Sequence, residues 1–308
     1  MVILLAQKFT RFYNKLENHH HHHYDHHEGE EPLKAFRSEV SKLIDELASD
    51  LKPGSKILSL IWIKKCLGII PLINKAFAKL SFEIDYPMSK WETDSIEEYL
   101  SFTLCLLELF NSISSSLSHL EQARLSLIHA LKVLENSSSL ATRNLKAIKP
   151  SCFNPKFGEE LCRKSDKARV FNGKEWIFNE ALKELKSFGY WVCGVFLSSL
   201  CSDVKPYMEI KKKACGFDGS LVLKLDSIIT EGLMNKTIML KEVKDVNDDV
   251  DYLVVASDET KHDAAKELER KLNKFVKLCD VVKEEVDGLF SKVMILRTEL
   301  IDQLRVQR

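Results

Sequence analysis

The sequence lacks the short motifs by which many enzymes are recognised. Its eleven glycines form neither GxGxxG nor GxxxxGK[ST], so it has no dinucleotide-binding fingerprint and no phosphate-binding loop of these types. HExxH and GxSxG, which mark zinc peptidases and hydrolase nucleophiles, are also missing. The isolated His262 begins a charged stretch, where we expect it to be exposed. We therefore predict a protein that is not an enzyme, with no catalytic residue, cofactor-binding residue or metal site.

An excess of charge of either sign is missing as well. The chain has 308 residues, in which 45 Lys and Arg balance 45 Asp and Glu. No basic surplus is available to neutralise a phosphate backbone, which disfavours nucleic-acid binding. The longest strongly apolar run covers only 188–201, whereas a membrane-spanning helix needs about 20 residues. We predict a buried helix there, with membrane contact as the alternative.

The eight cysteines include no CxxC pair and lie mostly among apolar residues. This usage is typical of a reducing compartment, so we expect small buried thiols rather than disulfides. An acidic stretch, "DVNDDV" at 245–250, resembles the start of an EF-hand loop but has Val250 and Ala256 where Gly and Glu are needed. We predict an acidic connector there, followed by a short connector "YLVVA" at 252–256 and by Ser257 and Asp258 as helix caps.

Residues 1–31 differ in composition from the rest. Leu5, Phe9, Phe12 and Leu16 recur at steps of four, three and four, which predicts one apolar helix face, a candidate membrane or docking face. We expect it to pack on the main body, with a membrane-surface anchor or a plastid targeting peptide as alternatives. "HHHHHYDHH" at 19–27 is a low-complexity run that cannot fix ligand geometry, so we predict a flexible spacer. A metal- or pH-sensitive element and a purification tag are the alternatives.

Residues 32–308 predict a single helical domain. Helical apolar spacing occurs from Pro32 to about 52, and again at 56–80, 93–136, 174–201 and 219–243. Pro71 is expected to kink or divide the second helix. We expect a loop at 81–92, a cap at Thr93 or Asp94, and a break near the serines of 112–116. The segment near 137–172 has little periodicity and predicts an irregular insertion or linker.

The C-terminal segment has the clearest pattern, because apolar residues alternate steps of four and three from Leu268 to Leu300 without interruption. This heptad spacing predicts a long helix that forms either the seam of an intramolecular bundle or a coiled coil with a partner. No comparable period-two alternation is present. We predict an all-α, elongated multi-helix bundle, with four candidate partner-binding residues: Leu289, Val293, Leu296 and Leu300.

Two segments resemble the plant BYPASS-related family, whose members are described together with relatives that bind an exocyst subunit. They are "LSLIWIKKCLGIIPLINKAFAKL" (58–80) and "SKWETDSIEEYLSFTLCLLELFNSISSSLSHLEQARLSLIHALKVLE" (89–135). With the apolar "VCGVFLSSL" and the C-terminal helix in the expected order, the resemblance covers most of 32–308. These are core patterns, so they assign no catalytic residue.

The resemblance implies a role in root and shoot development, including restraint of a root-derived mobile signal that arrests shoot growth. We expect a non-enzymatic regulator that acts through helix packing with protein partners, an exocyst subunit being one candidate. The alternative is a membrane-associated adaptor for secretion, and an enzyme acting on the signal is the weakest hypothesis. The expected location is the cytoplasm or the periphery of a membrane, with the plastid as the alternative.

Overall fold

The structure is a computed structural model that describes residues 30–51, 57–136, 145–149, 173–233 and 239–306. The described chain is built almost wholly of helices, so the predicted all-α, elongated bundle with a long C-terminal helix is confirmed. The predicted docking face at 5–16 and the His-rich run lie outside the described residues. The α-helices are α2 (Glu30–Ser49), α3 (Leu60–Glu83), α4 (Thr93–Asn136), α6 (Lys174–Cys201), α7 (Lys205–Lys213), α8 (Leu223–Leu233), α9 (Lys241–Val255) and α10 (Asp258–Val306).

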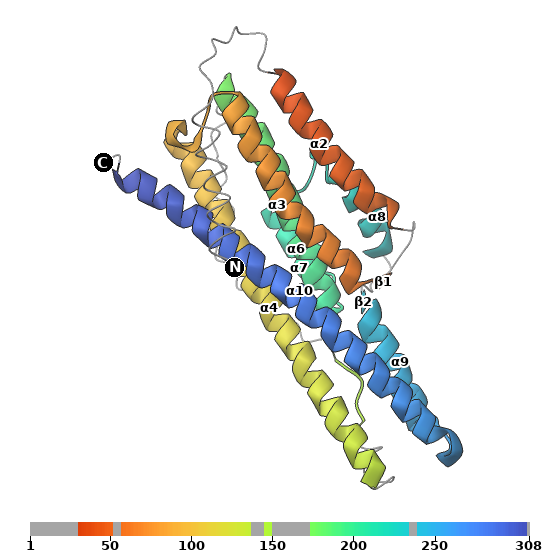
Figure 1. Ribbon diagram of the computed structural model, residues 1–308. Coiled ribbons are helices and arrows are strands. Elements are labelled where there is room, and N and C mark those ends of the chain that lie inside the picture. The colour runs from red at the N-terminus through yellow and green to blue at the C-terminus, as the bar shows by residue number, and fades with distance from the viewer. Residues whose placement is uncertain (1–29, 52–56, 137–144, 150–172, 234–238, 307–308) are drawn as a thin grey trace.

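Helix α6 lies in the middle of the bundle and packs on α3, α4 and α7. Helix α10 crosses the molecule diagonally and packs on α4, α9 and α3 (Figure 1). Two short strands, β1 (Ile57–Leu58) and β2 (Met239–Leu240), form one parallel pair in which Ile57 lies opposite Met239. This pair sets the starts of α3 and α9 side by side. From there α9 and α10 extend together as a helical hairpin at one end of the molecule (Figure 1).

The apolar run 188–201 forms the second half of α6, and every side chain in it is buried. The prediction of a buried helix is therefore confirmed. Within the described ranges, one helix is long and apolar enough to cross a membrane by length and composition, namely Thr93–Leu134 in α4. Of its apolar window, 61% is buried inside the protein, as expected for a core helix.

Several predicted breaks in the first half are wrong. Helix α3 runs through Pro71 without dividing and continues to Glu83, so the loop expected at 81–92 is shorter and contains a 3-10 turn, η1 (Met88–Lys90). Helix α4 begins at Thr93 and is uninterrupted at the serines. The hydroxyls of Ser112 and Ser116 each donate to the carbonyl oxygen four residues earlier, at 2.9 Å. These bonds satisfy the hydroxyls inside the helix, so they need no break.

The predictions for 202–258 also need correction. Helix α7 was not predicted, and the helix expected at 219–243 is divided into α8, β2 and the start of α9. The acidic "DVNDDV" is not a connector, because α9 includes it and continues through "YLVV" to Val255. Val243, Val246, Val250 and Leu253 are buried at helical spacing, and their burial stabilises α9 despite its acidic composition. Helix α10 then begins at Asp258, directly after Ser257, as predicted.

Candidate functional site

The four candidate partner-binding residues of α10 lie inside the bundle. Leu289, Val293, Leu296 and Leu300 are all buried. Arg297 fixes this part of α10 to α4, because its Nη1 donates to the carbonyl oxygen of Leu100 and, at 3.2 Å, to Oγ1 of Thr103. The heptad pattern therefore forms an intramolecular seam, in which the chain's own helices cover the four side chains.

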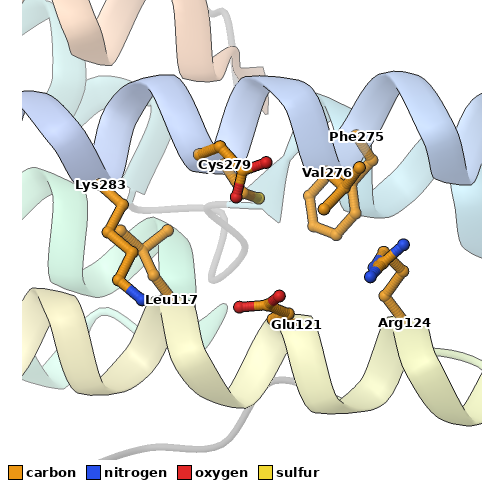
Figure 2. Close-up of a pocket in the computed structure, with 8 residues that line it drawn as sticks. Leu117, Glu121, Arg124, Phe275, Val276, Cys279 and Lys283 are labelled. Atoms are coloured by element: carbon orange, nitrogen blue, oxygen red, sulfur yellow. The ribbon is translucent and has the colours of Figure 1, made fainter.

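A small hollow lined by both charged and apolar side chains lies between α4 and α10 (Figure 2). Glu121 and Arg124 of α4 face it from one side, and Asp280 and Lys283 of α10 line the other. Its volume of about 10 Å³ is the space of a single water, which is too small for an organic ligand. The Nε of Arg124 is buried without a hydrogen-bond partner, so it is the group that one water here would satisfy.

Cys279 also lines this hollow. Burial, followed by the negative charges of Glu242, Asp280 and Glu121, raises the pKa of its thiol to about 12. A thiol with so high a pKa stays protonated near neutral pH and is a poor nucleophile. The hollow therefore offers neither room for an organic ligand nor a reactive thiol.

A buried tyrosine and aspartate join α7 to α8. The hydroxyl of Tyr207 donates to one carboxylate oxygen of Asp226, and Lys211 Nζ binds the other at 2.6 Å. Burial, followed by the hydrogen bond to Asp226, raises the pKa of Tyr207. Each polar group in this cluster has a protein partner, so its arrangement serves to hold the two helices together.

A second buried carboxylate lies on α6. Glu184 accepts the backbone N–H of Leu221 at 2.8 Å and lies 3.6 Å from Nε of Arg37 on α2. Burial raises the pKa of Glu184. Because it touches α2 and the segment before α8, this carboxylate fixes three parts of the chain to one another.

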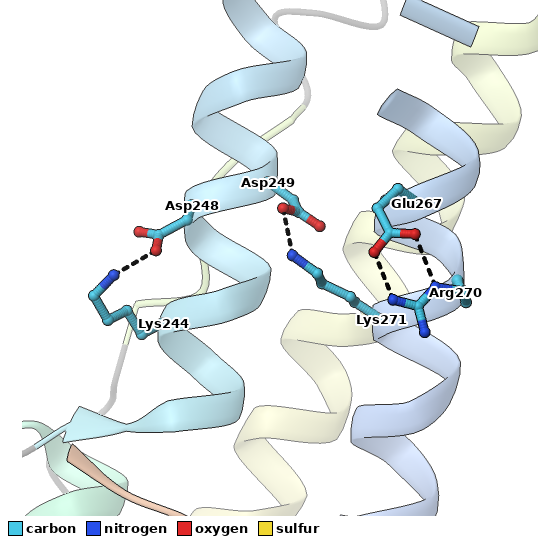
Figure 3. Close-up of polar contacts among 6 residues, drawn as sticks. All are labelled: Lys244, Asp248, Asp249, Glu267, Arg270 and Lys271. Atoms are coloured by element: carbon cyan, nitrogen blue, oxygen red, sulfur yellow. Dashed lines mark hydrogen bonds and ion pairs between the residues drawn. The ribbon is translucent and has the colours of Figure 1, made fainter. Parts of the chain in front are cut away.

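The α9–α10 hairpin is held by both apolar and charged contacts. Inside it, the buried residues of α9 pack with those of α10, among them Leu268 and Leu272. Lys271 of α10 binds Asp249 of α9 at 2.6 Å, and Arg270 and Glu267 pair along α10 at 2.6 and 2.8 Å (Figure 3). Lys244 pairs with Asp248 along α9. The hairpin is therefore a preformed projection with a packed interior.

Three large apolar side chains are exposed where this hairpin turns. Tyr252 is 56% exposed, Val254 42% and Val255 78%; we call these three residues the hairpin tip. They lie off the buried stripe of α9 and next to the exposed Asp251. Tyr252 and Val255 lie one helical turn apart, and exposed apolar side chains on a rigid element are typical of a protein contact surface. This surface was not predicted from the sequence, because 252–256 was expected to be a short connector.

No group of three or more His, Cys, Asp or Glu residues suited to a metal ion occurs in the described part of the chain. His119, His129 and His262 are exposed, which for His262 confirms the expectation. Five of the six described cysteines are buried, as predicted, whereas Cys215 is exposed.

The described residues define an elongated helical bundle with an exposed apolar tip on one hairpin. No family model matches the chain, and no solved structure matches it. The chain is 27% identical over 193 residues to "UPF0496 protein 4" of rice, in both Oryza sativa subsp. indica and subsp. japonica. The aligned region covers 57% of this chain. That match spans only 41% of the length of the rice proteins.

The chain is also 25% identical over 292 residues to "Protein BPS1, chloroplastic" of Arabidopsis thaliana, a match that covers 87% of this chain and 81% of that protein. The resemblance based on the 58–80 and 89–135 motifs is thereby confirmed: the chain is related to the plant BPS proteins. Both motifs correspond to core helices, α3 and the larger part of α4.

Proposed function

We propose that the protein is a non-enzymatic regulator of plant root and shoot development, which restrains production of a root-derived mobile signal that arrests shoot growth. The similarity to BPS1 of Arabidopsis over 87% of the chain is the observation that carries this proposal. The developmental role comes with the family resemblance.

In this proposal the protein acts through helix-mediated contacts with other proteins. The exposed side chains of the hairpin tip support this mode of action, since Tyr252 and Val255 present apolar area from the end of a rigid hairpin. The heptad seam is less suited to it, because the four residues first considered are buried. An exocyst subunit is a proposed partner, docking by helix packing on the tip.

Reciprocal grafting tests the developmental role. Wild-type shoots are grafted onto roots in which the gene is disrupted, and disrupted shoots onto wild-type roots. If the protein restrains a root-derived signal, shoot growth arrests only on disrupted roots, and expression of the wild-type chain in the root restores it. Arrest that follows the genotype of the shoot, or normal growth in both grafts, would contradict the proposal.

Proximity labelling with the full-length protein tests the contact mode. A variant with Tyr252→Ser and Val255→Ser is compared with a matched variant, Leu125→Ser and Met208→Ser, whose apolar side chains are similarly exposed elsewhere on the surface. If the tip variant alone loses a defined set of labelled proteins, the result supports the hairpin tip as the surface that contacts them. Equal labelling by both variants would contradict it. The presence of exocyst subunits in that set decides the proposed partner.

A fluorescent fusion of the full chain determines the location. We propose the cytoplasm or the periphery of a membrane, whereas the printed name of the Arabidopsis relative includes the word "chloroplastic". Fluorescence confined to plastids would overturn the proposed location and would leave the grafting result unaffected.

A further inference from the structure

An extended segment, residues 145–149, lies beside α9 in a manner seen when proteins bind peptides (Figure 1). The side-chain amide of Asn247 on α9 pairs with both backbone groups of Ile148. The Ile148 N–H donates to Oδ1 at 2.7 Å, and Nδ2 donates to the Ile148 carbonyl oxygen at 3.0 Å. One amide thus replaces the neighbouring strand that an extended residue would pair with in a sheet. Such pairing recognises backbone and places no demand on side-chain identity.

The side chains of the segment supply the selectivity. Leu145 and Ile148, three residues apart, are both buried and belong to the hydrophobic core. Lys146 and Lys149, which follow them, are exposed. The site beside α9 therefore accepts two buried apolar side chains and binds the backbone of Ile148 through Asn247. The two lysine side chains of the segment stay exposed to solvent.

The charge of α9 matches these lysines. This helix contains five carboxylates and two lysines, so its surface potential favours a basic ligand. Asp248 and Asp249 are held in place by their pairing with Lys244 and Lys271. Both of these carboxylates are thereby neutralised, and the exposed Asp251, four residues after Asn247, is the acidic side chain of α9 on the same helix face as the clamp.

The hold on this segment is short and local. Among the described residues, one amide clamp and two buried apolar side chains hold this segment, which lies in neither a helix nor a strand. Release of such a segment is a local opening that leaves the packed stripes of α9 and α10 intact. A segment tethered in the same chain also acts at a high effective concentration, so it blocks weaker ligands and yields to stronger ones.

We propose that the surface of α9 around Asn247, together with the two buried positions that Leu145 and Ile148 fill, is a peptide-binding site that residues 145–149 occupy in the same chain; we call this site the groove. Its partner is an extended peptide of another protein with two apolar residues three positions apart, each followed by Lys or Arg. Displacement of the chain's own segment by that peptide would couple partner binding to release of the segment. The inference rests on the proposed role in protein contacts and names a second surface for it.

Fluorescence anisotropy with a labelled peptide of residues 143–151 tests the site in the full-length protein. The variant Leu145→Ser with Ile148→Ser frees the groove, and we expect it to bind the peptide at least ten-fold more tightly than the wild-type protein. Adding Asn247→Ala should abolish that gain, because the backbone clamp is lost. Adding Tyr252→Ser, at the hairpin tip, should leave it unchanged. A peptide whose Leu and Ile are replaced by Ser should not bind.

Failure of the freed variant to bind, with its helical circular dichroism retained, would overturn the proposal, as would binding that Asn247→Ala does not weaken. Where the freed variant does not fold, hydrogen exchange of the Ile148 amide in the wild-type protein decides. Excess peptide should accelerate exchange of that amide, and an unchanged rate overturns the proposal. The peptide-binding measurements test the groove alone, whereas grafting tests the developmental role. Either proposal can therefore fail while the other holds.

Discussion

Glu242, in the first turn of α9, accepts the backbone N–H of Leu60 with both carboxylate oxygens, each at 3.2 Å. Leu60 is the first residue of α3, where backbone N–H groups have no partner inside the helix. The side chain of Ser59 accepts the N–H of Trp62 at 3.2 Å, so two side chains share the capping of α3. The start of α3 is thereby fixed to the start of α9, beside the β1–β2 pair.

Replacement of Glu242 by Ala is expected to lower the free energy of unfolding by about 0.5–2 kcal/mol, the usual cost of a lost N-terminal cap. Chemical denaturation measures this difference. Glu259→Ala, at an exposed position in the first turn of α10, is the matched control and should change stability by about 0.5 kcal/mol or less. Equal effects of the two substitutions would show that the contact to Leu60 contributes nothing.

The pH dependence of stability should change when Glu184 is replaced by Gln. Burial raises the pKa of Glu184 above its ordinary 4.5, so the folded protein disfavours the charged carboxylate. Below pH 4.5 the group is protonated in both states and carries no penalty. As the pH rises above that value, the unfolded state releases its proton first, and stability falls until the pH exceeds the folded pKa.

Urea unfolding of both proteins at pH 4, 5.5 and 7 checks this sign. The wild-type protein should lose stability relative to Glu184→Gln over that range, since Gln keeps an acceptor for the Leu221 N–H without a charge to bury. A constant difference between the two proteins would mean that Glu184 does not titrate in this range, and a gain by the wild-type protein would contradict the shift.

Leu289→Ala tests whether the heptad seam is core. Because Leu289 is buried between this chain's own helices, the substitution should cost about 2–5 kcal/mol of stability in the isolated protein. Val281→Ala, on the exposed side of the same helix, should cost about 0.5 kcal/mol or less. If Leu289→Ala left stability unchanged but removed partners from the labelled set, the seam would be an interface instead.

Local spacing predicted the elements whose apolar pattern is continuous, whether the helix is buried on one side or all round. The heptad steps from Leu268 to Leu300 predicted α10, and the all-round apolar character of 188–201 predicted the buried half of α6. Helix α9 was not predicted, because its many aspartates were interpreted as an acidic connector. Its buried residues nevertheless recur at the helical steps of three, four and three: Val243, Val246, Val250 and Leu253. A count of apolar spacing alone would have found it.

Contacts between distant residues could not be predicted in this way. Glu242 and Leu60 are 182 positions apart, and Asn247 and Ile148 are 99 apart. Nothing in the local sequence around Asn247 distinguishes an amide that clamps a backbone from an exposed one. The groove, and the capping of α3 from α9, follow only from the packing that brings these segments together.

Tyr207→Phe should destabilise the contact between α7 and α8. It removes the hydroxyl that donates to the buried Asp226, so that carboxylate keeps only Lys211 and the loss is about 1–3 kcal/mol. Because the two partners share one carboxylate, Tyr207→Phe and Lys211→Met should not be additive, and a double-mutant cycle measures the coupling. Strict additivity would show that the two contacts act independently.

Thiol labelling gives a direct test of cysteine burial in the native protein. Cys215 is exposed and should react rapidly with a maleimide at neutral pH. Burial raises the pKa of the Cys66 thiol and that of the Cys193 thiol. The pKa of Cys279 is raised to about 12, mainly by burial. Little reactive thiolate therefore forms at these three positions near neutral pH. Their labelling, measured by mass spectrometry of digested protein, should therefore become fast only in denaturant. Cys215→Ser removes the one exposed cysteine among the described residues and is the control. Rapid native labelling of Cys193 would mean that the centre of α6 opens to solvent. The cysteines expected to be protected are Cys66, Cys105, Cys193, Cys201 and Cys279.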